Sequence, residues 1–343
     1  MIAKREEEIR AFRPQEYYGL QVQAGKIQWT WQDQKSGGFR SFSKERIETI
    51  SSFVSNEKLS VKKVEKAAKK KYAPGLYDLT ELQRDANQKF GFSAKETLNI
   101  MQRLYENHKV LTYPRTDSRY IGTDIVDTIK DRLRAISVGP YKKLAGSLVM
   151  KPLRTNKSFV DDKKVSDHHA IIPTEQYVQL EHMTSEERKI YDLVVRRFLS
   201  VLYPPFEYEQ TTLHAVVLGE HAGKNSEEHF VAKGKIVKEA GWKIVYDYEE
   251  EEAEEGLKEQ SLPTIEAGDR LPVERAAVTR GKTKPPAHFT EATLLSAMEN
   301  PVRYMESRDQ KAARTLGETG GHGKVDTRSD SRDKFFSSCL MEE

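Results

Sequence analysis

The stretch from Leu111 to Tyr120 is Leu-Thr-Tyr-Pro-Arg-Thr-Asp-Ser-Arg-Tyr, which gathers phenol, guanidinium, carboxylate and hydroxyl groups in a short space. A proline disfavours helical backbone angles in the residue before it, so Pro114 keeps Tyr113 extended. Asp and Ser, which follow in the same stretch, are typical turn and capping residues. We therefore expect Tyr113 at the end of a strand or on a turn, away from any helix face.

The neighbours of Tyr113 allow two interpretations. In the functional one, a reactive phenol held on a turn beside Arg115 takes part in phosphoryl transfer to a protein side chain. In the structural one, Tyr113 is a packing residue, and Arg115 and Asp117 form a surface ion pair. These residues alone leave both interpretations open.

Length and composition limit the class of protein. The chain has 343 residues and a formal net charge of only +3, although 32% of its residues are charged. This length suits two or more domains, and a mildly basic total is compatible with one strongly basic face. The single cysteine, Cys339, excludes a disulfide framework and indicates a reducing compartment. No apolar run reaches the roughly 18–20 residues that span a bilayer, and the first residues are not a signal peptide. We expect a soluble, cytoplasmic protein.

Alternation of apolar and polar residues predicts strands at both ends of a long central segment. Residues 17–24 and 27–31 alternate on either side of a Gly turn, which is typical of an antiparallel hairpin. Similar patterns occur at 211–218 and 230–237. Between them, the lysine-rich stretch 61–71 has two interpretations, a solvated face or a surface that follows a phosphate backbone.

Apolar residues at helical spacing dominate the central segment. We expect four amphipathic helices there: one that stops at Gly91, one with Leu98, Met101, Leu104 and Tyr105 on its buried side, one from about Asp124 to Ile136, and one that ends at Pro204. Three of them begin at Thr80, Ser93 and Thr184, each followed three residues later by Glu or Gln, as in a capping box. A further helix is expected near 291–300.

The order of these patterns predicts an α+β fold in three parts. A β domain consists of residues 1–73 and 208–272 and is interrupted by a helical insert, residues 74–207, which carries Tyr113. Residues 273–343 form a partial helical domain. Within it, the Gly-rich stretch 316–324 lacks the spacing of a phosphate-binding loop and does not follow a strand.

A second polar stretch, Asp167-His168-His169, ends the irregular part of the insert. Adjacent histidines invite a metal interpretation. However, neighbouring residues of an extended segment point to opposite sides, and no third ligand follows at a metal-type spacing. We expect one histidine to act beside a phosphate and the other to be structural.

Several motifs together resemble one known family. They are Arg5-Glu6-Glu7-Glu8-Ile9, Leu76–Asn87 (LYDLTELQRDAN), Tyr113–Tyr120 (YPRTDSRY), Asp167–Thr174 (DHHAIIPT), Thr283–Ala292 (TKPPAHFTEA) and Leu316–Gly321 (LGETGG). In this order they resemble the type IA DNA topoisomerases, of the bacterial topoisomerase III kind. The resemblance runs nearly from end to end, so it favours the functional interpretation of Tyr113.

The resemblance implies a reaction and roles for residues. Tyr113 would attack a DNA phosphodiester and become linked to the 5′ phosphate, in a cycle of single-strand cleavage, strand passage and religation that relaxes or decatenates DNA. Arg115 would hold the phosphate oxygens, because its planar charged fork suits them, and His168 would position the scissile phosphate. The supporting and DNA-contacting residues would be Thr116, Asp117 and Ser118 on the active turn and Lys284 and Arg328 near the carboxyl end. The helical insert would move on a β arch, and the protein would be a monomer associated with the bacterial nucleoid.

The chain also departs from the family pattern. The family begins with a Toprim domain, whose Asp-x-Asp-x-Glu motif binds Mg²⁺, and no such motif is found here, so no metal ligand is assigned in this chain. We expect an amino-terminally truncated topoisomerase, with Mg²⁺ ligands on a separate Toprim-bearing chain and a helicase as a possible further partner. Residues 325–330 are more acidic than the family pattern. The alternative is a catalytically incompetent remnant that only binds single-stranded DNA.

Overall fold

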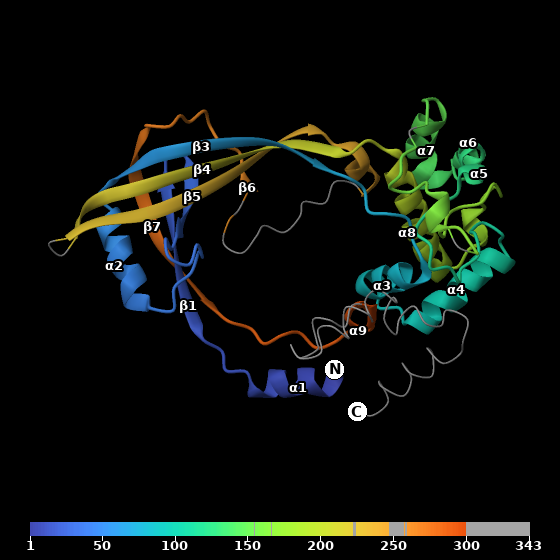
Figure 1. Ribbon diagram of the computed structural model, residues 1–343, viewed down its shortest axis with the longest axis horizontal. Coiled ribbons are helices and arrows are strands. Elements are labelled where there is room, and N and C mark those ends of the chain that lie inside the picture. Colours follow the sequence, from blue (N-terminus) through green and yellow to red (C-terminus); the bar gives the residue numbers. More distant parts are fainter. Residues whose placement is uncertain (154, 166, 222–223, 247–256, 258, 300–343) are drawn as a thin grey trace.

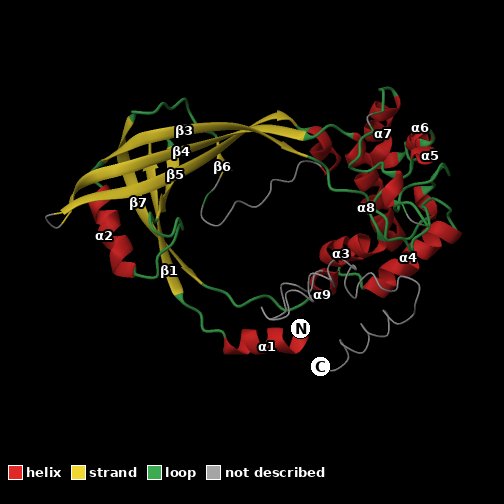
Figure 2. Ribbon diagram, in the orientation of Figure 1, coloured by secondary structure: helices red, strands yellow, loops and turns green. Residues whose placement is uncertain are grey.

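The computed structural model describes residues 1–299 except 154, 166, 222–223, 247–256 and 258. Its elements form a ring, which consists of a curved sheet, a group of helices and a short connecting unit (Figure 1). Figure 2 shows that the strands lie on one side of this ring, with α2 beside them, and that most helices lie on the other side. The predicted α+β class, with a β arch next to a helical body, is confirmed.

The arch is one sheet of seven strands within the described residues, in the order β2-β1-β7-β3-β4-β5-β6. The strands are β1 (Glu16–Ala24), β2 (Ile27–Gln32), β3 (Lys58–Lys71), β4 (Phe206–His221), β5 (Lys224–Glu239), β6 (Glu259–Gln260) and β7 (Arg270–Lys282). Strand β2 also pairs with β5, so the sheet curls back on itself at this end. All pairings are antiparallel except that of β5 with β6.

The predicted hairpin is present and carries much of the sheet's core. Leu20, Val22, Trp29 and Trp31 are fully buried, as the alternation predicts, because side chains of a strand alternate between its two faces. Helix α2 (Lys44–Val54) covers this core with its apolar stripe, and the hydroxyl oxygen of Ser43 caps its first turn.

The lysine-rich stretch forms most of β3, which was not predicted as a strand. Its first part buries Leu59 and Val61, and the lysines that follow are exposed along a ladder with β4. The sheet also continues past residue 272, where the sequence places the end of the β segments, because β7 pairs with β1 as far as Lys282. The rest of the three-part division stays a prediction.

The helical body follows β3 and has its own core, separate from that of the sheet. Its helices are α3 (Leu79–Phe90), α4 (Ala94–Glu106), α5 (Thr123–Val126), α6 (Ile129–Ala135), α7 (Lys142–Val149) and α8 (Ser185–Leu202). The capping boxes are confirmed only in part. Thr184 and Glu187 form one at the start of α8, and Ser93 caps α4.

Two helix predictions need correction. Helix α3 is capped by Asp78, and the predicted cap, Thr80, is buried inside the helix. The predicted helix 124–136 is divided into α5 and α6, because the hydroxyl of Thr128 donates to the carbonyl oxygen of Ile125 (2.8 Å). Such a bond between side chain and backbone competes with helical hydrogen bonding.

A small third unit completes the ring. It consists of α1 (Ile2–Ala11) and α9 (Glu291–Glu299), whose apolar residues form a separate cluster. Helix α9 contacts α3, and the unit lies between the lower end of β1 and the helical body (Figure 1). Among the described helices, none has the length and apolar content required to cross a membrane.

Candidate active site

Two segments far apart in the sequence lie side by side and form the site. Leu111 pairs with Pro173 in an isolated β-bridge, and the backbone N–H of Thr112 donates to the carbonyl oxygen of Ile172 (3.0 Å). The Thr112 hydroxyl donates in turn to the carbonyl oxygen of Ala170 (3.0 Å). This pairing brings the Tyr113 turn and the Asp167–His169 stretch to the same place.

The phenol ring of Tyr113 lies between two other rings. The imidazole of His168 is 4.4 Å away between ring centroids at an interplanar angle of 39°. Tyr105, at the end of α4, meets it edge-on at 5.6 Å and 81°. Tyr113 is half-buried and His168 is exposed. The phenol therefore contacts two rings and remains partly exposed to solvent.

The helical pattern assigns Tyr105 to the buried side of its helix and gives no sign of its contact with Tyr113. Tyr105 is 38% exposed and lies at the edge of the apolar stripe of α4. A helical pattern shows which face of the helix is buried, but it does not show which distant loop contacts the edge of that face. No local feature of the sequence could have revealed this contact.

The residues that follow Arg115 support the turn from within. Thr116 and Ser118 are buried, at 3% and 4% exposure. The Thr116 hydroxyl donates to the carbonyl oxygen of His168 (3.2 Å), and its oxygen accepts the backbone N–H of Ser118 (3.1 Å). The Ser118 hydroxyl donates to the carbonyl oxygen of Lys164 (3.0 Å). Because these bonds cross from one segment to the other, both residues help to set the distance between Tyr113 and His168. Asp117 is exposed.

Arg115 follows Tyr113 by two residues on the same turn and is half-buried. Within the described part of the chain it makes no hydrogen bond or ion pair. By contrast, Arg119 is committed to the framework, since its Nε–H donates to the carbonyl oxygen of Leu76 (3.1 Å) and it pairs with Glu81 (3.6 Å). Arg115 is thus the arginine of this turn whose donors are available to an anion.

The two adjacent histidines diverge, as expected for an extended segment. His169 faces away from the phenol, and its Nδ1 accepts the backbone N–H of Gly122 (3.1 Å). Its other ring nitrogen lies 3.4 Å from a carboxylate oxygen of Asp124. His169 therefore anchors the start of α5, and His168 is the histidine beside Tyr113.

A partly buried carboxylate lies beneath the turn. Asp78 caps α3 by accepting the backbone N–H of Glu81 (2.7 Å), and burial raises the pKa of its carboxyl to about 6, against the opposing effects of that hydrogen bond and of the Arg119 charge. The next residue, Leu79, donates its backbone N–H to the carbonyl oxygen of Thr116 (3.1 Å). The start of α3 is thus attached directly to the active turn.

The family resemblance implies magnesium, which requires a group of suitable ligands. Mg²⁺ is bound through carboxylates and other oxygen ligands. Across the described residues, no three Asp, Glu, His or Cys side chains gather where an ion would be held. The described side chains around Tyr113 therefore do not fit a magnesium site.

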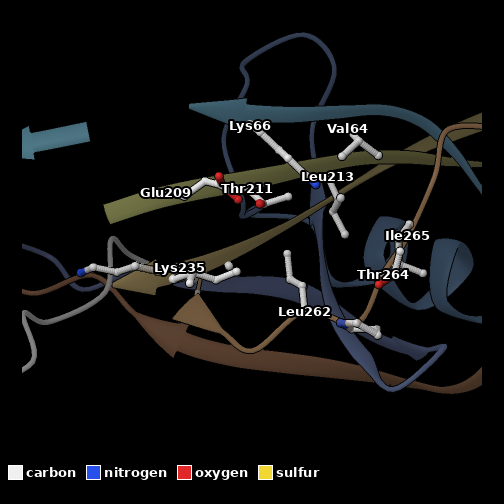
Figure 3. A pocket seen from close by; sticks show the side chains of 12 residues that line it. Val64, Lys66, Glu209, Thr211, Leu213, Lys235, Leu262, Thr264 and Ile265 are labelled. Carbon is white, nitrogen blue, oxygen red and sulfur yellow. The ribbon is translucent and has the colours of Figure 1, made fainter. Parts of the chain in front are cut away.

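Of the two predicted DNA contacts, Lys284 lies within the described residues. Lys284 is exposed just after β7, in the connection to α9, and is not brought to the Tyr113 turn. Arg328 lies outside the described residues, as do the acidic residues 325–330 and the Gly-rich stretch 316–324. A cavity of about 150 Å³ is present on the sheet instead, between β4, β5 and residues 262–265 (Figure 3). None of its lining residues belongs to the helical body.

Comparison with known proteins identifies the family. The family described as "DNA topoisomerase" matches residues 1–327. DNA topoisomerase 3 of Bacillus cereus (strain ATCC 10987 / NRS 248) is 56% identical over 346 residues, covering 100% of this chain and 46% of the relative. The corresponding protein of Bacillus subtilis (strain 168) is 48% identical over 344 residues, with the same coverage. The chain thus spans about half the length of these curated relatives.

A solved structure supports the fold. Full-length topoisomerase I from Thermotoga maritima matches with a TM-score of 0.63 at 23% identity, over 92% of this chain and 48% of that one. At this identity the match concerns the fold alone. Together with the family match over residues 1–327, it accounts for the ring of arch and helical body. The chain belongs to the DNA topoisomerase family and is similar to its type IA members of the topoisomerase III kind.

Proposed function

We propose that Tyr113 is the nucleophile of a type IA topoisomerase reaction on single-stranded DNA. The observation that carries this proposal is the position of its phenol, which contacts the rings of His168 and Tyr105 and remains partly exposed to solvent. A phenol with a pKa near 10 is a weak nucleophile unless a neighbouring group stabilises the developing anion. The uncommitted guanidinium of Arg115 supplies positive charge on the same turn.

The reaction exchanges one phosphodiester for another. The Tyr113 oxygen forms a bond to phosphorus and loses its proton, the bond from phosphorus to the 3′ oxygen of the preceding nucleotide breaks, and that oxygen takes up a proton to become a 3′ hydroxyl. The 5′ phosphate remains on Tyr113. Attack by the 3′ hydroxyl on this phosphotyrosine reverses each step and reseals the strand after another strand has passed.

Arg115 and His168 act on the phosphate in this scheme. The planar guanidinium binds two phosphate oxygens at once and stabilises the charge that they gain in the transition state. His168 lies against the phenol face and positions the scissile phosphate beside the attacking oxygen. Thr116, Asp117 and Ser118 belong to the turn that sets this geometry, and Lys284 and Arg328 would contact the DNA backbone away from the reacting bond.

A second candidate is a chain that binds single-stranded DNA without cleaving it. It is favoured by the lack, among the described residues, of an acidic cluster that would hold Mg²⁺ beside Tyr113. Under the first proposal a separate Toprim-bearing chain supplies the metal ligands, whereas under this alternative the chain takes no part in cleavage. We expect the chain alone to bind single-stranded DNA with an affinity that falls steeply with salt, and not to relax supercoiled plasmid. Mg²⁺-dependent relaxation by the chain alone would exclude this alternative.

The deciding experiment traps the covalent intermediate. The chain is mixed with a separately produced Toprim fragment of a relative, Mg²⁺ and single-stranded DNA that carries a label on the 3′ side of the cleaved bond. Denaturation should leave this label on the chain, as a 5′ phosphotyrosine requires. Tyr113→Phe should abolish the adduct, whereas Tyr72→Phe, which removes the hydroxyl of an exposed tyrosine outside the site, should retain it. An adduct that survives Tyr113→Phe would refute the assignment.

A further inference from the structure

The sheet closes into a barrel, and one mouth of this barrel carries the cavity of Figure 3. Strand β2 pairs with both β1 and β5, so β2, β1, β7, β3, β4 and β5 form a closed series of hydrogen-bonded neighbours. In the described structure, the pairing of β3 with β7 is limited to Lys58–Ser60. The cavity, of about 150 Å³, lies beside the following part of β3, between β4, β5 and residues 262–265. The mouths of β-barrels are frequent sites for small ligands.

The floor of the cavity is apolar and continuous with the core of the sheet. Leu213 is 1% exposed, and Val64, Leu262 and Ile265 are partly buried against the same core. Gly234 leaves room for this floor, because a Cβ atom there would lie 2.5 Å from carbon atoms of the Leu262 side chain. An apolar cavity of this volume is large enough for a benzene ring. The floor therefore suits an apolar group of the size of a leucine side chain.

Two groups of opposite charge lie at the rim of the cavity. Lys66 on β3 is opposite Thr211 on β4, and Glu209 is two residues from Thr211 on the same face of that strand. Figure 3 shows these three side chains next to one another along one side of the cavity. Among the described residues, neither Lys66 nor Glu209 has an ion-pair or side-chain hydrogen-bond partner.

These groups together select the chemical class of the ligand. The ammonium of Lys66 donates hydrogen bonds and the carboxylate of Glu209 accepts them, and such bonds are strongest when the partner carries the opposite charge. A ligand with a single charge would satisfy one of the two groups and face a like charge on the other. A zwitterion satisfies both, and the apolar floor adds a hydrophobic substituent to the description.

We propose that this barrel mouth binds a free α-amino acid with an apolar side chain. The carboxylate of the ligand accepts hydrogen bonds from the Lys66 ammonium and the Thr211 hydroxyl, and its ammonium donates to Glu209. Its side chain contacts Leu213 and Leu262. The described helical body contributes no residue to the lining, so binding here is separate from the chemistry proposed at Tyr113.

Leucine is the probe that tests the site. Ligand-observed NMR titration of the full chain should give saturable binding with a dissociation constant of about 10 mM or lower, as expected for a ligand of this size. Isocaproate lacks the ammonium of leucine, isoamylamine lacks its carboxylate, and glycine lacks its side chain. Each should bind about tenfold more weakly or worse, because each loses a charged hydrogen bond or the apolar contact. Absence of saturable leucine binding, or equal binding of all four compounds, would overturn the proposal.

Substitutions assign the two charges of the ligand to their partners. Lys66→Met should weaken leucine binding about tenfold and leave leucine no better than isoamylamine, since the carboxylate has lost its partner. Glu209→Gln should likewise remove the advantage of leucine over isocaproate. Lys69→Met is the matched control, because Lys69 is exposed on the opposite face of β3 and does not line the cavity.

The control decides between a built site and general attraction to a basic strand. Lys69→Met should leave the affinity for leucine unchanged, and thermal melting should show that all three variants fold. Equal losses in Lys66→Met and Lys69→Met would refute the site. The titrations contain neither DNA nor Mg²⁺, so failure of the reaction proposed at Tyr113 would leave their result unaffected.

Discussion

The imidazole of His168 lies against the phenol of Tyr113, with ring centroids 4.4 Å apart. Their two segments are joined by the Thr116 hydroxyl, which donates to the carbonyl oxygen of His168 (3.2 Å). The catalytic geometry that we propose therefore depends on contacts between two loops, and changes to those contacts have predictable effects.

Replacing His168 by Ala should slow formation of the covalent adduct about 10²-fold, since misplacing reacting groups by about 1 Å has an effect of this size. The measurement is single-turnover adduct formation with the Toprim fragment and Mg²⁺ present. His169→Ala is the matched control, because this ring contacts Gly122 and Asp124 instead of the phenol. Equal losses in the two variants would show that position 168 has no special role in the reaction.

Arg115 should matter both to DNA affinity and to the reaction. Arg115→Ala removes one phosphate contact, so the slope of log affinity against log salt should fall by about one. Arg115→Lys should restore that slope but only part of the rate of adduct formation, because an ammonium cannot bind two phosphate oxygens as a planar fork does. A lysine variant with full rate would argue against bidentate binding.

The raised pKa of the Asp78 carboxyl predicts an unusual dependence of the free energy of unfolding on pH. This pKa is raised to about 6 in the folded protein, so between about pH 4 and pH 6 the folded state keeps a proton that the unfolded state loses. The contribution of this carboxyl to stability is therefore present at low pH and is lost as the pH rises to 6. Asp78→Asn, which keeps an N-cap oxygen, should match the wild type near pH 4 and exceed it by on the order of 2–3 kcal/mol above pH 6.

Denaturation by urea at a series of pH values checks this prediction, with Asp33→Asn as a control of opposite sign. Hydrogen bonds from Ser36 and Arg46 lower the pKa of the Asp33 carboxyl. The stability that it contributes is present above the unfolded pKa and disappears as the pH falls. Asp33→Asn should therefore be less stable than the wild type near neutral pH and approach it in acid. The prediction for Asp78 fails if its Asn variant follows the same course.

The connection between sheet and helical body depends on a buried ion pair. Arg197 of α8 pairs with Asp85 of α3 (2.7 Å) and donates to the carbonyl oxygen of Gly75 (3.0 Å) in that connection. Asp85→Ala leaves the guanidinium buried without its counter-ion and should lower the free energy of unfolding by about 3 kcal/mol. Glu48→Ala, which breaks the exposed pair with Lys44, should have an effect of less than about 1 kcal/mol. Equal decreases in the free energy of unfolding of the two variants would show that the buried pair contributes no more to stability than the exposed pair.

Local patterns predicted much of the secondary structure. The hairpin of β1 and β2, helix α8 and the caps at Ser93 and Thr184 follow from periodicity and from short-range hydrogen bonds. The two wrong helix predictions arise because another nearby side chain forms the hydrogen bond that decides the helix boundary. Asp78 replaces Thr80 as the cap of α3, and the Thr128 hydroxyl divides a predicted helix.

The sequence by itself determined the fold class, the family and the reactive stretch around Tyr113, because each depends on residue order and on short-range spacing. Only the tertiary structure decided that Tyr105 joins His168 at the phenol, that β7 continues the sheet to Lys282 and that α9 closes the ring on α3. These contacts join residues that are distant in the chain. Their free energy comes from burial and from hydrogen bonds made after the elements have formed, and no local pattern encodes which elements meet.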